Sequence, residues 1–209
     1  MPSSGDQPVG VVLAGGSGRR MGGGKPFRML AGRTLLERAL DSLAPFCSRR
    51  VVVAGDLTPL AHLSCELLAD RWPGQGPLAA ILTAMLDTDA QSFLVLAVDL
   101  PLVRPQVLDL LIRRSRKPAV WAVAAAGPGG VEPLMAVYHR RCMAVARRLV
   151  DQGERRPRML LEAVQARLLT PQEMAEADPD GLSLINVNHP QDLERVVQLT
   201  DACGLFDTP

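Results

Sequence analysis

The chain has 209 residues, of which 47% are hydrophobic and 22% charged, and its 23 Lys and Arg residues nearly balance its 22 Asp and Glu residues. This composition excludes a disordered tail, a collagen-like chain and a strongly basic nucleic-acid-binding protein. Aromatic residues make up only 3%, which argues against stacking on single-stranded bases. We therefore expect one domain over residues 1–209, with loose tails at 1–8 and 201–209, that binds small molecules or proteins and no nucleic acid.

The cysteines and the apolar segments indicate where such a protein works. The four cysteines are widely spaced and form no CxxC pair, which favours a reduced, cytoplasmic protein. Residues 1–8 have neither the basic nor the apolar region of a secretory signal. The longest apolar run, Phe93 to Val103, is interrupted by Asp99 and is too short to span a bilayer. We therefore expect a soluble, cytoplasmic protein with no membrane contact.

The first elements alternate between strands and helices. Val9 to Ala14 is continuously apolar, as expected of a central strand covered on both faces, and a glycine-rich loop follows it. Helical spacing of apolar residues over Thr34 to Leu43 begins with a capping box, Thr34 and Glu37, and Pro45 ends it. Two further strands are predicted at Arg50 to Ala54 and Glu66 to Ala69.

The middle of the chain continues the alternation. A helix is predicted over Leu78 to Leu86, directly after Gly76-Pro77, because proline suits the first helical turn. The predicted elements that follow are a buried strand, a helix and two strands: Phe93 to Val98, Pro105 to Arg114, Ala119 to Ala125 and Leu134 to Tyr138. The last two strands flank a Gly-Pro-Gly-Gly turn, which predicts a hairpin or a bent antiparallel excursion.

The C-terminal third contains helices and one expected loop. Helices are predicted over His139 to Val150, Arg158 to Gln165 and Pro190 to Leu199. Thr170 to Gly181 is acidic and rich in helix breakers, so we expect a surface loop there, and Leu184 to Asn188 should return to the core as a strand. Strands alternating with helices along the whole chain predict an α/β fold with a mostly parallel sheet.

The glycine loop from Leu13 to Lys25 is the strongest chemical feature. Glycines let backbone N–H groups converge on an anion, and its three cations, Arg19, Arg20 and Lys25, can neutralise phosphate charge. The loop fits neither a Walker A motif nor the GxGxxG dinucleotide fingerprint, whose last glycine is replaced by Met21. The alternative is a mobile loop with solvated cations. Phosphate binding is the preferred interpretation, because so much glycine directly after a buried strand is costly without a ligand.

Asp99 ends the apolar strand at Phe93 to Val98. Ligands of open α/β sheets bind beyond the carboxyl ends of the strands, where one carboxylate can hold Mg²⁺ against nucleotide phosphates. A turn-forming or helix-capping Asp is the alternative. Two weaker features are the Arg155, Arg156 and Arg158 cluster, which is either an anion site or a solvated surface, and the amides Asn186 and Asn188, which either hold a ligand or cap a turn.

In this order, the motifs resemble those of the MobA-like nucleotidyltransferases. The matching segments are LAGGSGRRMGGGK at Leu13 to Lys25, PGQGPLAAI at Pro73 to Ile81, DLP at Asp99 to Pro101 and INVNHP at Ile185 to Pro190, with softer matches EPLMAVYHRR at Glu132 to Arg141 and GERRPRMLL at Gly153 to Leu161. The resemblance implies a Rossmann-like three-layer α/β/α sandwich of the nucleotide-diphospho-sugar transferase type. It also implies Mg²⁺-dependent transfer of GMP from GTP to the phosphate of molybdenum-molybdopterin, and downstream insertion or acceptor proteins as partners.

The resemblance also assigns roles to residues at the matching positions. Catalysis would fall to Arg20, Lys25 and Asp99, with Arg20 and Lys25 on the phosphates and Asp99 on the metal. The nucleotide would lie along Leu13, Ala14, Gly15 and Gly16, with Asp70 at its base or ribose. The pterin substrate or the reacting phosphates would face Arg155, Arg156, Asn186 and Asn188.

Two positions depart from the family pattern. Gly24 stands where the family has an Asp before the loop lysine, which leaves open a looser Lys25 or a weaker metal site. Ala54, directly after the VVV of the second strand, stands where guanylyltransferases have an Asn, so Asp56 or Asp70 would have to accept hydrogen bonds from guanine. The alternatives are a cytidylyltransferase or other nucleotidyltransferase of the same fold, or a non-catalytic nucleotide- or pterin-binding relative.

Overall fold

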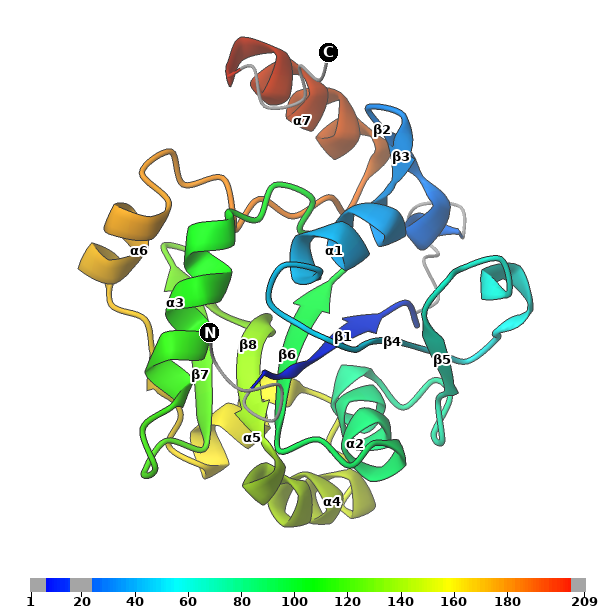
Figure 1. Cartoon of the computed structure of the whole chain (residues 1–209), viewed down its shortest axis with the longest axis vertical. Helices are drawn as coiled ribbons and strands as arrows, with labels where there is room; N and C mark the ends of the chain where they lie inside the picture. Colours follow the sequence, from blue (N-terminus) through cyan, green and yellow to red (C-terminus); the bar gives the residue numbers. More distant parts are fainter. Residues whose placement is uncertain (1–6, 16–23, 204–209) are drawn as a thin grey trace.

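The computed structural model describes residues 7–15 and 24–203, and it is built around one seven-stranded sheet in the order β5-β4-β1-β6-β8-β7-β9 (Figure 1). Its strands are β1 (Val9–Leu13), β4 (Arg50–Ala54), β5 (Glu66–Ala69), β6 (Ser92–Ala97), β7 (Ala122–Gly127), β8 (Gly130–His139) and β9 (Arg167–Leu168). All of them run parallel except β8, which is antiparallel to both of its neighbours. The expected α/β fold with a mostly parallel sheet is confirmed.

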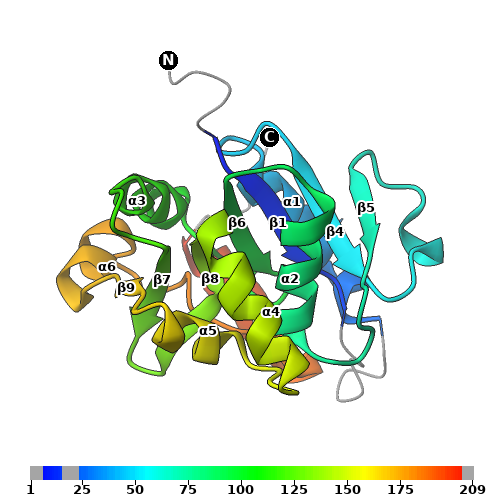
Figure 2. The same ribbon diagram turned by 90° about the horizontal axis from the view of Figure 1, so that it is seen from below.

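Helices cover both faces of this sheet, which makes three layers (Figure 2). One apolar core joins the sheet to α1 (Leu35–Leu43), α3 (Pro105–Ser115) and α6 (Pro171–Ala177). The other core joins it to α2 (Pro77–Asp87), α4 (Met143–Asp151) and α5 (Pro157–Ala163). The central strand β1 is buried along its whole length, in agreement with its continuous apolar sequence.

Local sequence signals explain several of these boundaries. Thr34 caps α1 through its side chain, which accepts the backbone N–H of Glu37, and the Glu37 side chain accepts the N–H of Thr34 in return. The turn between β7 and β8 makes the predicted hairpin, with Gly127 paired to Gly130. Helix α2 starts at Pro77, directly after Gly76 at φ 90°. Among the described residues, no helix has the length and apolarity needed to cross a membrane.

A third, smaller core lies beyond the carboxyl end of the sheet. It packs α7 (Pro190–Cys203) against the short hairpin of β2 (Met29–Leu30) and β3 (Arg33–Thr34), which are neighbours in Figure 1. Its buried members are Leu30, Leu35, Leu102, Leu182, Val187 and Val196. This core holds two segments from distant parts of the chain, 24–35 and 182–196, next to the end of β6.

Three expectations about the C-terminal third are corrected. Residues 170–181 contain helix α6 instead of a loop, because Thr170 and Glu173 form a second capping box and Pro171 occupies the first turn. Leu184 to Asn188 forms no strand in the described structure, and a single backbone bond, from the Val187 N–H to the Asp99 carbonyl at 2.8 Å, ties it to the end of β6. Helix α7 continues to Cys203, past the predicted end at Leu199.

Candidate active site

The candidate site begins where β1 and β6 end side by side. Leu13, the last residue of β1, pairs with Ala97, so Asp99 lies two residues beyond that pair. Ala14 donates its N–H to the Val53 carbonyl at 3.0 Å, and Gly15 is exposed. The chain therefore turns into the glycine loop at the carboxyl edge of the sheet, where α/β proteins bind their ligands. Of the residues predicted to follow a nucleotide, Gly16 lies outside the described part of the chain, as does the predicted catalytic Arg20.

Lys25 brings three distant parts of the chain together. Its Nζ lies 2.7 Å from Oδ2 of Asp99 and 3.0 Å from Oδ1 of Asn188, 74 and 163 positions along the chain. The side chains of Lys25 and Asp99 are only 17% and 24% exposed, so water screens this ion pair less than it would on an open surface. Three of the predicted site residues therefore meet at one point.

The position of Gly24 explains how the lysine is aimed. Gly24 has φ 67°, a left-handed conformation that glycine adopts without steric cost, and Lys25 directly begins a short 3₁₀ turn, Lys25–Phe27. The absence of an Asp before the lysine does not leave Lys25 loose, because Asp99 and Asn188 both accept its hydrogen bonds. Added bulk at Gly24 would meet no atom within 4 Å in the described structure, so strain and not space opposes it there.

The oxygen atoms around Lys25 are suited to a hard divalent cation. The Asp99 carboxylate and the Asn188 amide oxygen already converge on one positive charge, the Lys25 ammonium. Among the described residues, no group of three or more His, Cys, Asp or Glu side chains could enclose a metal. This donor set fits Mg²⁺, which takes few protein ligands and completes its shell with water and substrate phosphates.

Glu132 is a further candidate site residue, to which its sequence context assigns no role. It is half-buried at the end of β8 that faces Asp99, and burial raises the pKa of its carboxyl group, with a further contribution from the charge of Asp99. Its carboxylate accepts a hydrogen bond from the Leu134 N–H at 3.0 Å. A sequence signal was available, since Glu132 opens the EPLMAVYHRR segment, but a single Glu before a proline has no chemical meaning until its neighbours are known.

The arginine cluster lies at the start of α5, against the start of α2. The Arg155 carbonyl accepts the Leu78 N–H at 3.2 Å, which joins the PGQGPL and GERR segments directly. Arg155 and Arg156 are exposed, and the Arg156 guanidinium pairs with Glu154 at 2.8 Å. That ion pair and the backbone N–H groups of Arg155 and Arg156 lower the pKa of Glu154 to about 2. Glu154 takes the Nε and Nη2 donors of Arg156, so an anionic substrate would compete with Glu154 for these two nitrogens.

Asp70 and Asp56, the two residues considered for base recognition, already accept hydrogen bonds that stabilise turns. One oxygen of Asp70 accepts the Trp72 N–H at 3.0 Å and the Thr83 hydroxyl at 3.4 Å, which links the end of β5 to α2. Asp56 is exposed, and its carboxylate accepts the Thr58 N–H at 2.9 Å. Each carboxylate has a second oxygen, so neither turn by itself prevents contact with a base.

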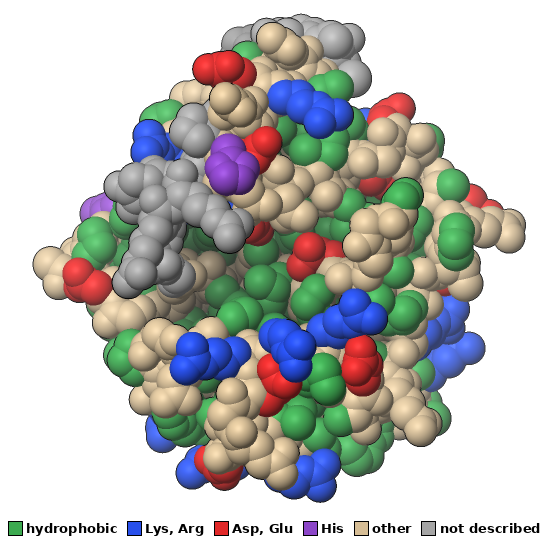
Figure 3. Space-filling model, turned by 180° about the vertical axis from the view of Figure 1, so that it is seen from behind, with side chains coloured by type: hydrophobic (Ala, Val, Ile, Leu, Met, Phe, Trp, Pro, Cys, Tyr) green, Lys and Arg blue, Asp and Glu red, His purple; other side chains and the backbone are tan. Residues whose placement is uncertain are grey.

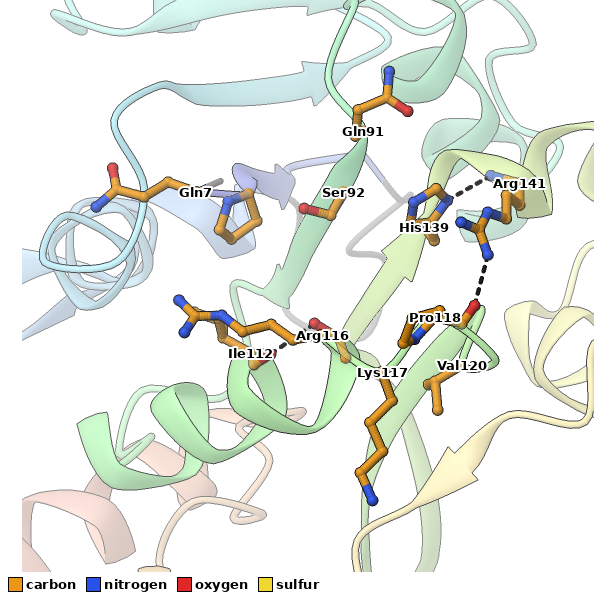
Figure 4. Close-up of a pocket in the computed structure, with 12 residues that line it drawn as sticks. Gln7, Gln91, Ser92, Ile112, Arg116, Lys117, Pro118, Val120, His139 and Arg141 are labelled. Carbon is orange, nitrogen blue, oxygen red and sulfur yellow. Dashed lines mark hydrogen bonds between the residues drawn. The ribbon is translucent and has the colours of Figure 1, made fainter. Parts of the chain in front are cut away.

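A second concavity lies away from this site. Figure 3 shows a hollow with a hydrophobic floor and with Lys and Arg side chains along its border. A pocket of about 330 Å³ lies instead at the opposite edge of the sheet, where β6 begins at Ser92 and β8 ends at His139. Figure 4 shows Arg116 and Lys117 in that pocket extending in different directions and Arg141 turned toward the Pro118 carbonyl. Its cations do not converge, so we assign no ligand to it.

Comparison with known proteins points to one family. Residues 10–168 match the model of the MobA-like NTP transferase domain. A molybdenum cofactor guanylyltransferase of Desulfosudis oleivorans is 34% identical over 197 residues, which cover 91% of this chain and 94% of that protein. A protein of Chloroflexus aggregans, named a probable molybdenum cofactor guanylyltransferase, is also 34% identical, over 90% of this chain and 92% of its own length. The crystal structure of molybdopterin-guanine dinucleotide biosynthesis protein A from Archaeoglobus fulgidus superposes with a TM-score of 0.81 at 29% identity, covering 93% of this chain and 99% of that one.

Proposed function

The chain belongs to the MobA-like NTP transferase family, and on that basis we propose that it transfers GMP from GTP to the terminal phosphate of molybdenum-molybdopterin, releasing pyrophosphate. The observation that carries the proposal is the meeting of Lys25, Asp99 and Asn188 at the carboxyl edge of the sheet. Relatives that cover nine-tenths of this chain bear the corresponding name. A nucleotidyltransferase needs charge neutralisation and positioning there more than a protein nucleophile.

In this reaction, one bond forms and one bond breaks at the α-phosphorus of GTP. An oxygen of the terminal phosphate of molybdopterin attacks in line, and the bond from the α-phosphorus to the bridging oxygen breaks. Pyrophosphate leaves with that electron pair. Lys25, freed from Asp99 by the incoming nucleotide, offsets the charge that grows on the leaving group, and Arg20 has the same proposed role.

Asp99 and the amide oxygen of Asn188 would hold Mg²⁺. When bound, the ion supplies charge neutralisation to the nucleotide phosphates. The ammonium of Lys25 now donates hydrogen bonds to both oxygens, so a metal ion would compete with Lys25 for them and favour a turn of the lysine toward the phosphates. The same movement would place the lysine where the leaving group forms.

The substrates would lie on the two sides of this centre. Leu13, Ala14, Gly15 and Gly16 would follow the nucleotide, with Asp70 at its base or ribose. Arg155, Arg156, Asn186 and Asn188 would face the pterin substrate. The backbone carbonyl of Arg155 accepts a hydrogen bond from the Leu78 N–H at the start of α2. The arginine cluster therefore lies at the same edge of the sheet as the start of the glycine loop, which supports placing both substrates there. The product would pass to molybdenum-cofactor insertion or acceptor proteins in the cytoplasm.

Mass analysis of the product tests this proposal. The purified protein is incubated with GTP, Mg²⁺ and molybdopterin cofactor, and the pterin product is examined for an added GMP. We expect a pterin–guanine dinucleotide and one pyrophosphate for each GTP consumed. Unchanged pterin, in a reaction that an authentic guanylyltransferase completes under the same conditions, would refute the assignment.

A further inference from the structure

Asp178 is a buried carboxylate that has no part in the proposed chemistry. Its side chain is only 2% exposed, and a charged group is costly to bury unless it has partners. Oδ1 accepts the Leu182 N–H at 3.1 Å, and Oδ2 accepts the Ser183 N–H at 2.7 Å. The Arg104 guanidinium adds a neighbouring positive charge, with its Nε 3.8 Å from Oδ1. Both oxygens of Asp178 are thus committed to the stretch of chain that leads to Asn188.

Ser183 connects this anchor to the loop that follows β6. Its side chain is fully buried, and its hydroxyl oxygen accepts the backbone N–H of Arg104 at 2.9 Å. Four residues further on, the Val187 N–H donates to the carbonyl of Asp99 at 2.8 Å. The two stretches of chain between these bonds therefore run side by side in opposite directions, and the bonds fix their register.

Apolar contacts support the same register. Val187 is buried in the small core that packs against α7. Leu184 lies on Gly127, the last residue of β7, so closely that a Cβ at this glycine would overlap the leucine side chain. Asn188 directly follows Val187 and is thereby brought to the end of β6, where its Oδ1 lies 3.0 Å from Nζ of Lys25.

We propose that Asp178 is a positioning residue that, through Ser183, sets the register of these two stretches and so places the Asn188 amide oxygen against Lys25. In this role Asp178 acts only through the chain that it holds. The placement is a property of the protein without substrates. Its consequence for catalysis rests on the proposed function, in which Asn188 also holds Mg²⁺.

The chain has two lysines, which allow the contact to be measured without any substrate. Lys25 is 17% exposed and donates to Asp99 and Asn188, whereas Lys117 is exposed and serves as the internal reference. The protein is treated briefly with an acetylating reagent, and mass analysis of its peptides gives the rate at Lys25 relative to Lys117. The reagent attacks only an accessible, deprotonated amine, so a lysine released from Asn188 is acetylated faster.

Asp178→Asn weakens the anchor with almost no change of shape. An amide has one acceptor oxygen, so its NH₂ must face one of the two N–H donors, and that bond is lost. For Asn188→Ala, which removes one hydrogen bond to a charged group, we expect the relative rate at Lys25 to rise about tenfold, and for Asp178→Asn about threefold or more. The matched control is Asp180→Asn, which changes a 55% exposed carboxylate that pairs with the same Arg104. It should leave the relative rate unchanged.

Two further variants separate positioning from a general loosening of the fold. Ser183→Ala keeps Asp178 but removes the bond to the Arg104 N–H, and it should also raise the relative rate at Lys25. In an Asn188→Ala background, Asp178→Asn should cause no further rise, because the group that it positions is gone.

Labelling is carried out under conditions in which the buried Cys142 resists iodoacetamide in every variant, so that only folded protein is compared. Under the proposed function, Asp178→Asn should also raise the Mg²⁺ concentration that gives half-maximal turnover, and Asp180→Asn should not. An unchanged Mg²⁺ dependence in Asp178→Asn would overturn the consequence for catalysis.

The outcomes keep this inference and the proposed function apart. A relative rate at Lys25 that is the same in Asp178→Asn, Ser183→Ala and the wild type would overturn the positioning role. So would a rise that persists in the Asn188→Ala background. If labelling follows the predicted pattern but the wild-type protein transfers no nucleotide, the positioning role stands and the guanylyltransferase assignment falls.

Discussion

Among single residues, Lys25 is central to the candidate site because it contacts both Asp99 and Asn188. Its ammonium is held between one carboxylate and one amide oxygen, and it is sheltered enough for that attraction to matter. A nucleotide brings its own phosphate oxygens, which compete with Asp99 for the lysine, and a divalent cation competes with the lysine for Asp99. Under the proposed function, this ion pair of Lys25 and Asp99 would separate when the substrates bind, and would then supply the catalytic cation and the metal ligand.

Replacement of Asp99 by Asn tests the metal role. The variant keeps the shape of the side chain and leaves the backbone bond from Val187 unchanged, but it removes the charge that would attract Mg²⁺. We expect kcat to fall by about 100-fold or more, because the charge on the reacting phosphates is no longer offset as the transition state forms. Melting temperature should change little, because the Asn amide oxygen can still accept the hydrogen bond of Lys25 and the backbone bond from Val187 is kept.

Asp89→Asn is the control for that experiment. Asp89 is also an Asp that bonds to a cation, Arg49, but its side chain is 98% exposed and lies just before β6, at the edge of the sheet opposite the site. Its replacement should leave kcat within about twofold of the wild type. Turnover by the Asp99 variant that equals that of the Asp89 variant, with the same dependence on Mg²⁺ concentration, would show that Asp99 does not bind the metal.

Part of this site could be predicted from residues and part could not. The glycine loop and Asp99 each follow a buried parallel strand. Because parallel strands end at the same edge of a sheet, the sequence pattern predicts that the loop and Asp99 lie close together. The contact of Asn188 with Lys25 does not follow, because it depends on a segment without a strand that is held by one backbone bond. Glu132 was missed for a related reason, since its direction depends on a bulge that side-chain alternation does not reveal.

The start of α2 and the chain at Arg155 come into close contact at Gly76. Gly76 precedes α2, and a Cβ there would lie 2.9 Å from the Cβ of Arg155 and 3.0 Å from its carbonyl oxygen. Glycine is therefore needed for close approach as well as for its φ of 90°. The contact fixes the position of Arg155 and its neighbours relative to the first turn of α2.

Gly76→Ala and Gly74→Ala together test that contact. Both residues have positive φ, 90° and 80°, so both substitutions strain the backbone, and Gly76, with ψ 175°, lies in a region that is essentially restricted to glycine. The Cβ at Gly74 meets nothing within 4 Å in the described structure, so only Gly76→Ala also pushes Arg155 away. We expect urea unfolding to show Gly76→Ala less stable than Gly74→Ala by a further ~1–3 kcal/mol, and its KM for the pterin substrate to rise. Equal stabilities would mean that the two segments are not held together.

The helices show where local sequence rules succeed and where they were misapplied. The box of Thr34 and Glu37 correctly marks the start of α1. The same capping box occurs at Thr170 and Glu173, but the acidic residues and helix breakers around it led to the prediction of a loop. That prediction is wrong, because the structure has helix α6 there. The local signal was sufficient, because Pro171 falls in the first turn, where proline is tolerated, and Met174 is buried against the sheet layer.

At the scale of the whole molecule, one sheet unites two separate apolar cores. Cys47 lies in the core under α1 and α3, and Cys142 lies in the core under α2 and α4. Burial raises the pKa of each thiol to about 12, so neither forms the reactive thiolate at pH 8 in the folded protein. The two cysteines therefore report on the two faces of the sheet independently.

Cysteine labelling along a urea series tests whether the described fold is one cooperative domain. Because both cores share the central strands, we expect iodoacetamide to reach Cys47 and Cys142 at the same urea concentration, as read by mass analysis of each peptide. Cys65, which is half-buried, should react earlier and serves as the internal comparison. Labelling of one core at clearly lower urea than the other would show that the two faces unfold separately.

The nucleotide that this molecule uses is the most direct test of its function. Pyrophosphate release is measured with purified protein, Mg²⁺ and molybdopterin cofactor in parallel reactions containing GTP, CTP or ATP. The account predicts turnover with GTP, dependent on the pterin, and kcat/KM lower by about 100-fold or more with CTP and ATP, because neither base presents the paired N1–H and amino donors of guanine to a carboxylate. Preferred use of CTP would contradict the guanylyltransferase assignment, and no release with any nucleotide would contradict the proposed catalysis altogether.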